Sequence, residues 1–139
     1  MEDGNVQHID LIHNIIEEML EIQTRSQKFV TRITAGESLS QSHLVLLFQL
    51  KKQGSMKATD IAEFLHVTPG AVTSICDKLE SQSYIERTKD PKDRRIVKMI
   101  LTAKGEQKIK ELFSKFPTDE IEKMATTLFQ VRQLMSNIM

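Results

Sequence analysis

The sequence of 139 residues has no tryptophan, one tyrosine and one cysteine, Cys76. A single cysteine excludes an internal disulfide and a zinc site built from several cysteines. No apolar run approaches the roughly 18 residues that cross a bilayer. The opening residues, Met1 to Gly4, lack the basic start and apolar stretch of a secretion signal. We therefore expect a cytoplasmic protein with no membrane partner.

The chain also lacks net charge, because 19 Lys and Arg balance 19 Asp and Glu. These charges are unevenly distributed. Residues 51–110 hold thirteen Lys and Arg against eight Asp and Glu, residues 1–50 hold three against seven, and residues 111–139 hold three against four. A basic centre between mildly acidic arms is typical of a DNA-binding module with a separate assembly region, although a solvated charged face would give the same count.

Glycine and proline are few, at five and three residues, so helical patterns run uninterrupted. Residues 9–33 carry apolar side chains at helical spacing and predict one long helix that ends at Gly36. Ser40 is a candidate N-cap of a second helix, which Gly54 ends. A third, shorter helix is predicted in the segment that contains Ile61.

A fourth helix is predicted to begin at Thr68-Pro69, since a capping hydroxyl precedes a proline at the first helical position. Its expected buried face consists of Val72, Ile75, Cys76 and Leu79. The third and fourth helices together form a helix-turn-helix.

After Tyr84 the pattern changes from helical to extended, and the turn-forming segment 90–93 precedes the β-branched run 96–101. This predicts a two-stranded hairpin with a basic tip. A hairpin directly after a helix-turn-helix is the outline of a winged helix.

Thr102 is a candidate cap of a fifth helix, and Pro117 begins a sixth. The fifth is expected to carry Ile109, Leu112, Phe113 and Phe116 along one side, and the sixth to carry Ile121, Met124, Leu128, Val131, Met135 and Ile138 at helical spacing. The predicted fold is mainly α with a small β-hairpin. We expect residues 1–36 and 103–139 to serve dimerisation, and residues 37–102 to form the DNA-binding lobe.

The first and last helices are more apolar than helices lying alone on a small module require, which indicates burial against a second copy. The candidate dimerisation residues are Ile9, Ile12, Ile16, Leu128, Val131 and Met135.

The outward side of the fourth helix carries small and polar groups suited to entering a major groove. The candidate contacts there are Thr68, Pro69, Gly70, Thr73, Ser74 and Lys78. Those in the hairpin are Arg87, Lys89, Lys92, Asp93, Arg94 and Arg95. Arg94 and Arg95 can extend into a minor groove, Lys89 and Lys92 can bind phosphates, and Asp93 either orients an arginine or caps the turn.

Residues 39–105 resemble the MarR family of bacterial transcription regulators. The similarity lies in Leu39-Ser40, Asp60-Ile61-Ala62, Val67 to Thr73, Asp77 to Glu80, Ile85-Glu86-Arg87, Asp90 to Arg95, and Leu101 to Gly105. The resemblance implies a homodimer that binds a palindromic double-stranded DNA operator, most often as a repressor, with release by a small-molecule effector. It assigns the minor-groove contact to Arg95 and its orientation to Asp93.

Three positions depart from the family pattern. Ser83 stands where a glycine usually ends the recognition helix, so a left-handed cap is either adopted at some strain or replaced. His66 replaces the usual glycine of the motif turn. Ser74 is short where some relatives carry an arginine, which argues against a bidentate guanine contact there.

Alternatives remain. The winged helix could instead bind an acidic protein partner. Cys76 is either a packed, inert thiol or an oxidation sensor. His13 and Glu17 have helical spacing that is more typical of solvent-facing partners than of metal ligands. No nucleophile triad, glycine-rich phosphate loop or carboxylate pair stands out, so we expect no catalytic site, metal or cofactor.

Overall fold

The computed structural model describes residues 2–139, and side-chain exposure from residue 4 onward. The chain divides into two units, which meet between Gln41 and Ser42. The first unit contains helix α1 (Glu2–Thr34), which ends just before Gly36 at φ 75°. The helix begins earlier than the predicted residue 9, because its opening residues are mostly polar and give no apolar period. Across the described residues, no helix combines the length and apolarity that spanning a membrane requires.

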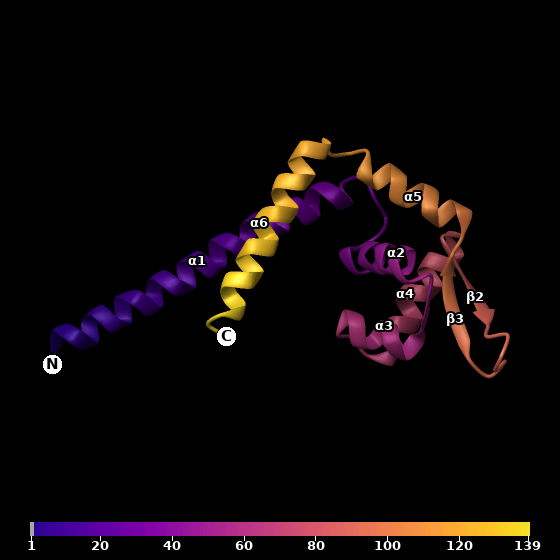
Figure 1. Cartoon of the computed structure of the whole chain (residues 1–139), viewed down its shortest axis with the longest axis horizontal. Coiled ribbons are helices and arrows are strands. Elements are labelled where there is room, and N and C mark those ends of the chain that lie inside the picture. The colour runs from indigo at the N-terminus through magenta and orange to yellow at the C-terminus, as the bar shows by residue number, and fades with distance from the viewer. Residues whose placement is uncertain (1) are drawn as a thin grey trace. The chain divides into compact units, whose positions relative to one another are not determined.

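The second unit follows the predicted order of helices (Figure 1). Its elements are α2 (Gln41–Gln53), β1 (Ser55–Lys57), α3 (Ala58–Leu65), α4 (Pro69–Ser81), β2 (Ile85–Lys89), β3 (Val97–Leu101), α5 (Ala103–Phe113) and α6 (Thr118–Ser136). Helix α4 contacts both α3 and β2, and α5 contacts β3. We call α4 the recognition helix and residues 85–101 the wing.

The predicted hairpin is confirmed as the antiparallel pair of β2 and β3, and a third strand that the sequence did not predict, β1, pairs with the other side of β3. The sheet is antiparallel and three-stranded in the order β1-β3-β2, and Met56 of β1 pairs with Met99 of β3. Both methionines are buried. A three-residue strand is too short to show the alternation by which strands are recognised in a sequence.

Apolar side chains from α2, α3, α4 and α5 and from all three strands form the core of the second unit. The buried side chains of the second unit are Leu44, Leu46, Leu47, Leu50, Met56, Ile61, Val72, Cys76, Leu79, Ile85, Met99, Ile109, Leu112 and Phe116. Ile75, which was predicted on the buried face of α4, is partly exposed. Phe113 on α5 is 53% exposed, and its ring lies 5.2 Å from that of Phe48.

Both helices of the helix-turn-helix end in left-handed residues that are not glycine, His66 at φ 54° and Ser83 at φ 65°. After α4, the Ser83 N–H donates to the Glu80 carbonyl at 2.9 Å, and the Tyr84 N–H donates to the Leu79 carbonyl at 3.0 Å. These bonds satisfy carbonyls that the helix end would otherwise leave unpaired. The left-handed cap is therefore adopted at Ser83 rather than replaced.

The start of α5 packs against the chain that links the recognition helix to the wing. Thr102 caps α5 by accepting a hydrogen bond from the Gly105 N–H at 3.0 Å. Its own N–H donates to the Tyr84 carbonyl at 3.1 Å. A Cβ on Gly105 would lie 2.1 Å from that carbonyl oxygen and 3.0 Å from Leu101 Cδ2. Only glycine fits this approach.

We predict that Gly105→Ala destabilises the lobe by roughly 1–3 kcal/mol or more, because its methyl group overlaps backbone atoms that cannot rotate away. Urea denaturation followed by circular dichroism measures the loss. Gly70→Ala is the matched control, since a Cβ at Gly70 meets only Thr68 Oγ1, at 4.0 Å. Equal stability of Gly105→Ala and the unsubstituted protein would contradict this packing.

Candidate nucleic-acid interface

The recognition helix begins as the sequence predicts. Thr68 Oγ1 accepts a hydrogen bond from the Ala71 N–H at 3.2 Å, and Pro69 occupies the first turn. The Thr73 hydroxyl donates to the Pro69 carbonyl at 3.2 Å. Thr68, Pro69, Gly70, Thr73 and Ser74 are all exposed. The start of the helix therefore presents small side chains, free of bulk, to an approaching groove.

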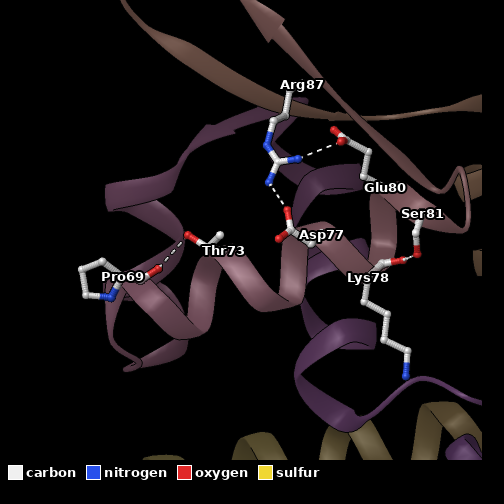
Figure 2. A network of polar contacts seen from close by, with 7 residues as sticks. All are labelled: Pro69, Thr73, Asp77, Lys78, Glu80, Ser81 and Arg87. Atoms are coloured by element: carbon white, nitrogen blue, oxygen red, sulfur yellow. Dashed lines mark hydrogen bonds and ion pairs between the residues drawn. The ribbon is translucent and has the colours of Figure 1, made fainter.

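Lys78 differs from the other candidates on this helix because it is half-buried. Figure 2 shows its side chain pointing to the side of α4 opposite Arg87. On that side the Lys78 charge opposes protonation of His43. Burial is the main cause that lowers the pKa of His43, and the Lys78 charge is the smaller one. Lys78 thus lies at the flank of the recognition helix.

The wing tip is built around the Asp90 carboxylate. This group accepts hydrogen bonds from the Lys92 N–H at 2.7 Å and the Asp93 N–H at 3.3 Å, and it pairs with Lys98 Nζ at 3.0 Å. The Lys98 hydrogen bond, followed by that of the Lys92 N–H, lowers the pKa of Asp90. These contacts fix the turn without using a cation at its tip.

Asp93 holds Arg95 through a fork of hydrogen bonds. Arg95 Nε donates to Asp93 Oδ1 at 3.0 Å, its terminal nitrogen donates to Oδ2 at 3.0 Å, and its backbone N–H donates to Oδ1 at 3.1 Å. The guanidinium contact is the main cause that lowers the pKa of the Asp93 carboxyl. The Arg95 side chain is nevertheless 90% exposed. Asp93 thus contacts both the side chain and the backbone of Arg95, which fits either an orienting or a turn-capping role, and the groove contact stays a prediction.

The remaining cations of the wing fall into two groups. Lys89, Lys92 and Arg94 are exposed near the tip, where the sequence placed them. Arg87 is not at the tip. It lies on β2 and donates to Asp77 and Glu80 of the recognition helix, each at 2.8 Å (Figure 2).

Sequence reasoning missed the partners of Arg87 and the Asp90–Lys98 pair. Asp77 and Glu80 are three residues apart, a spacing that puts two carboxylates on one helix face where a single cation can bind both. That spacing was available in the sequence. The strand residue facing it was not, because it depends on how β2 lies against α4.

Five of the six candidate dimerisation residues leave much of their apolar surface exposed in the described chain. Exposure is 58% for Ile9, 46% for Ile12 and 51% for Ile16 on α1. On α6 it is 52% for Leu128 and 42% for Met135, and Val131 is partly buried. Such an amount of exposed aliphatic surface is unusual for helices that act alone.

Cys76 lies on the buried side of the recognition helix and is 1% exposed. Burial raises the pKa of its thiol, and the nearby Arg87 charge opposes that rise. A buried, protonated thiol is a poor nucleophile, so this position favours the inert interpretation over the sensor. His13 and Glu17 form an exposed pair at 2.9 Å, as solvent-facing partners do.

The geometry defines a winged helix-turn-helix with a cationic wing. Residues 39–97 match the sequence profile of the MarR family. The transcriptional repressor MdtR of Bacillus subtilis is 40% identical over 78 residues, which are 56% of this chain and 50% of MdtR. The chain thus spans about half the length of this curated relative.

Solved structures agree with this match. The YusO protein of Bacillus subtilis is 27% identical with a TM-score of 0.63, covering 89% of this chain and 96% of YusO. Streptococcus pneumoniae FabT, crystallised with DNA, shares the fold at 21% identity, with a TM-score of 0.65 and coverage of 91% and 99%. The chain is thus similar to MarR-family transcriptional regulators over residues 39–97, which confirms the resemblance predicted from its motifs.

We predict that Cys76 reacts with a thiol reagent on the order of 100-fold more slowly in the folded protein than in urea, since reaction requires opening of the core. Absorbance of the released thiolate from an aromatic disulfide measures both rates. Cys76→Ser supplies the blank. Fast modification of the folded protein would favour the oxidation sensor instead.

Proposed function

We propose that this protein is a transcriptional repressor that binds a palindromic double-stranded DNA operator as a homodimer. One observation carries the proposal: an exposed arginine at the wing tip, Arg95, is held in a fixed orientation by Asp93. A preoriented guanidinium beside small residues on an adjoining helix suits simultaneous contact with a minor and a major groove.

In this proposal the start of the recognition helix enters the major groove. Thr68, Thr73 and Ser74 supply hydroxyls for base edges and phosphates, while Pro69 and Gly70 permit close approach. Lys89, Lys92 and Arg94 bind phosphates around the wing. Lys78 contacts the backbone from the flank of the helix.

The exposed apolar side chains of α1 and α6 support the homodimer. Two copies would place two recognition helices on one face of the duplex, about one turn or ~34 Å apart, and the operator would then be an inverted repeat. Residues 1–36 and 103–139 would serve assembly, and residues 37–102 DNA binding, inside a cytoplasmic regulator.

Release by a small ligand is part of the proposal at the level of the family. A MepR-like protein, 25% identical to this chain with a TM-score of 0.58, has been crystallised with pseudoligands. The rival function is a winged helix that binds an acidic protein through the same cations. Under this rival function, unlike the proposed one, the protein would not bind DNA.

We predict that purified protein enriches an inverted repeat from random duplex DNA, and that Arg95→Ala weakens binding to that repeat by about 1–3 kcal/mol, or roughly 5- to 150-fold. Fluorescence anisotropy on the enriched sequence measures the change. Lys110→Ala, a cation exposed on α5 outside the helix-turn-helix and the wing, is the control and keeps its affinity.

Salt dependence gives a second measure on the same DNA. Several phosphate contacts in each lobe make affinity fall steeply as salt rises. Enrichment of no sequence at low salt, together with capture of an acidic protein that depends on Arg95, would favour the protein-contact rival.

We also predict that Ile12→Glu shifts the protein from dimer to monomer, because a carboxylate at an apolar interface is desolvated without a partner. Sedimentation velocity at micromolar concentration measures the shift. Asn14→Glu places the same charge in the same turn of α1 at a polar position, and it is expected to remain dimeric. A monomeric unsubstituted protein would contradict the assembly.

A further inference from the structure

Arg87 joins the first wing strand to the recognition helix through two ion pairs. One terminal nitrogen donates to Asp77 Oδ1 and the other to Glu80 Oε1, both at 2.8 Å. Figure 2 shows the guanidinium between the two carboxylates, on the side of the helix away from Lys78. The Arg87 side chain is only 34% exposed, against 62% for Asp77 and 42% for Glu80.

This arrangement makes Arg87 a poor ligand for phosphate, because two of its five N–H donors are committed to carboxylates. Both terminal nitrogens already donate to carboxylates, and the hydrogen bond to Asp77 is the first cause that raises the pKa of Arg87. A phosphate at the remaining N–H donors of Arg87 would lie beside both carboxylates, whose negative charges would repel it.

The negative charge of Asp77 affects DNA binding because of where Asp77 lies on the recognition helix. Asp77 follows Thr73 by one helical turn, so both side chains lie on the same outward side of the recognition helix. Without a cation beside it, this carboxylate would repel the sugar-phosphate chain at the groove edge. Arg87 offsets the charge from within the fold.

The second effect is geometric. The covalent connection between α4 and β2 is short, residues 82–84, and Ser83 within it has a left-handed backbone. The Arg87 pairs add a side-chain brace across this connection, between the recognition helix and the wing. Fixing the angle between them matters because the two elements must reach neighbouring grooves together.

We infer that Arg87 is a positioning residue, which raises DNA affinity without contacting DNA by bracing the recognition helix against the wing and neutralising Asp77 and Glu80. This inference rests on the proposed function. It reassigns one wing cation, Arg87, from direct contact to support.

The test is a cycle of variants on the enriched DNA. Arg87→Ala is expected to weaken binding by about tenfold, a coupling within the usual range for residues of one ion-pair network. In the background of Asp77→Asn with Glu80→Gln, the same Arg87→Ala change is expected to have little effect, since its partners are no longer charged. Arg87→Lys, which can pair with only one carboxylate at a time, is expected to restore part of the affinity.

The salt dependence separates support from contact. Loss of a phosphate contact lowers the slope of log affinity against log salt by about one, whereas loss of a brace leaves the slope unchanged. Arg95→Ala is the comparison variant, and it is expected to lose the same factor in both backgrounds. Thermal unfolding of each variant, with the carboxylate-neutral background and Arg87→Lys included, separates lost affinity from lost folding.

Equal losses for Arg87→Ala in both backgrounds, with a smaller salt slope, would overturn the brace and return Arg87 to the DNA contacts. An Arg87→Ala protein that binds as tightly as the unsubstituted one would overturn it too. Failure of the unsubstituted protein to bind any duplex would overturn the proposed function, and the brace with it.

Discussion

Hydrogen bonds from Thr102 to the end of the recognition helix hold the base of the wing, and the geometry of the whole lobe depends on them. Its N–H donates to the Tyr84 carbonyl at 3.1 Å and its hydroxyl donates to the Ser83 carbonyl. The Thr102 hydroxyl oxygen also accepts a hydrogen bond from the Gly105 N–H. One threonine therefore connects the end of α4, both ends of the wing and the start of α5. Because these bonds lie away from the wing tip, the tip can vary without moving the recognition helix.

The charge that the lobe presents depends on which residues form ion pairs, and not only on how many charged residues it contains. The carboxylates of Asp77, Glu80, Asp90 and Asp93 all have cationic partners from the same lobe, at 2.8–3.0 Å. These four of the eight acidic residues in segment 51–110 therefore do little to repel a polyanion. Arg87 and Lys98, in turn, are engaged in ion pairs with these carboxylates and contribute less to an outward field than their number implies. A count of residues 51–110 detects the basic character of the segment but not which cations face outward.

Local signals in the sequence predicted the helices because each has a chemical start or stop. The Thr68 and Thr102 caps, Pro69 and the glycines after α1 and α2 act on neighbouring residues only, so no knowledge of the fold is needed to interpret them. The pairing of Asp93 with Arg95 was predictable for the same reason, since only one residue separates them in the chain.

Features that depend on distant parts of the chain were not predictable in this way. Strand β1 exists because Met56 pairs with Met99, far along the chain, and its three residues carry no pattern of their own. The placement of Arg87 depends on the packing of β2 against α4. The left-handed backbone at Ser83 is stabilised by the hydrogen bonds that follow α4, so serine is tolerated where glycine would be expected.

The pairing of an exposed arginine with Asp93 is difficult to explain as a stabilising contact for the free protein. An arginine side chain held in one rotamer loses conformational entropy, and an exposed ion pair recovers little of that loss because water screens the two charges. The pair therefore adds little to folding. Under the proposed function the benefit of the pair would arise on binding, because a guanidinium that is already oriented loses less freedom when it meets a partner. A narrow minor groove accepts a planar guanidinium in few orientations. An acidic protein surface would bind a flexible lysine equally well, so it would not require an oriented arginine. Orientation of Arg95 by Asp93 thus favours a nucleic-acid partner over a protein one.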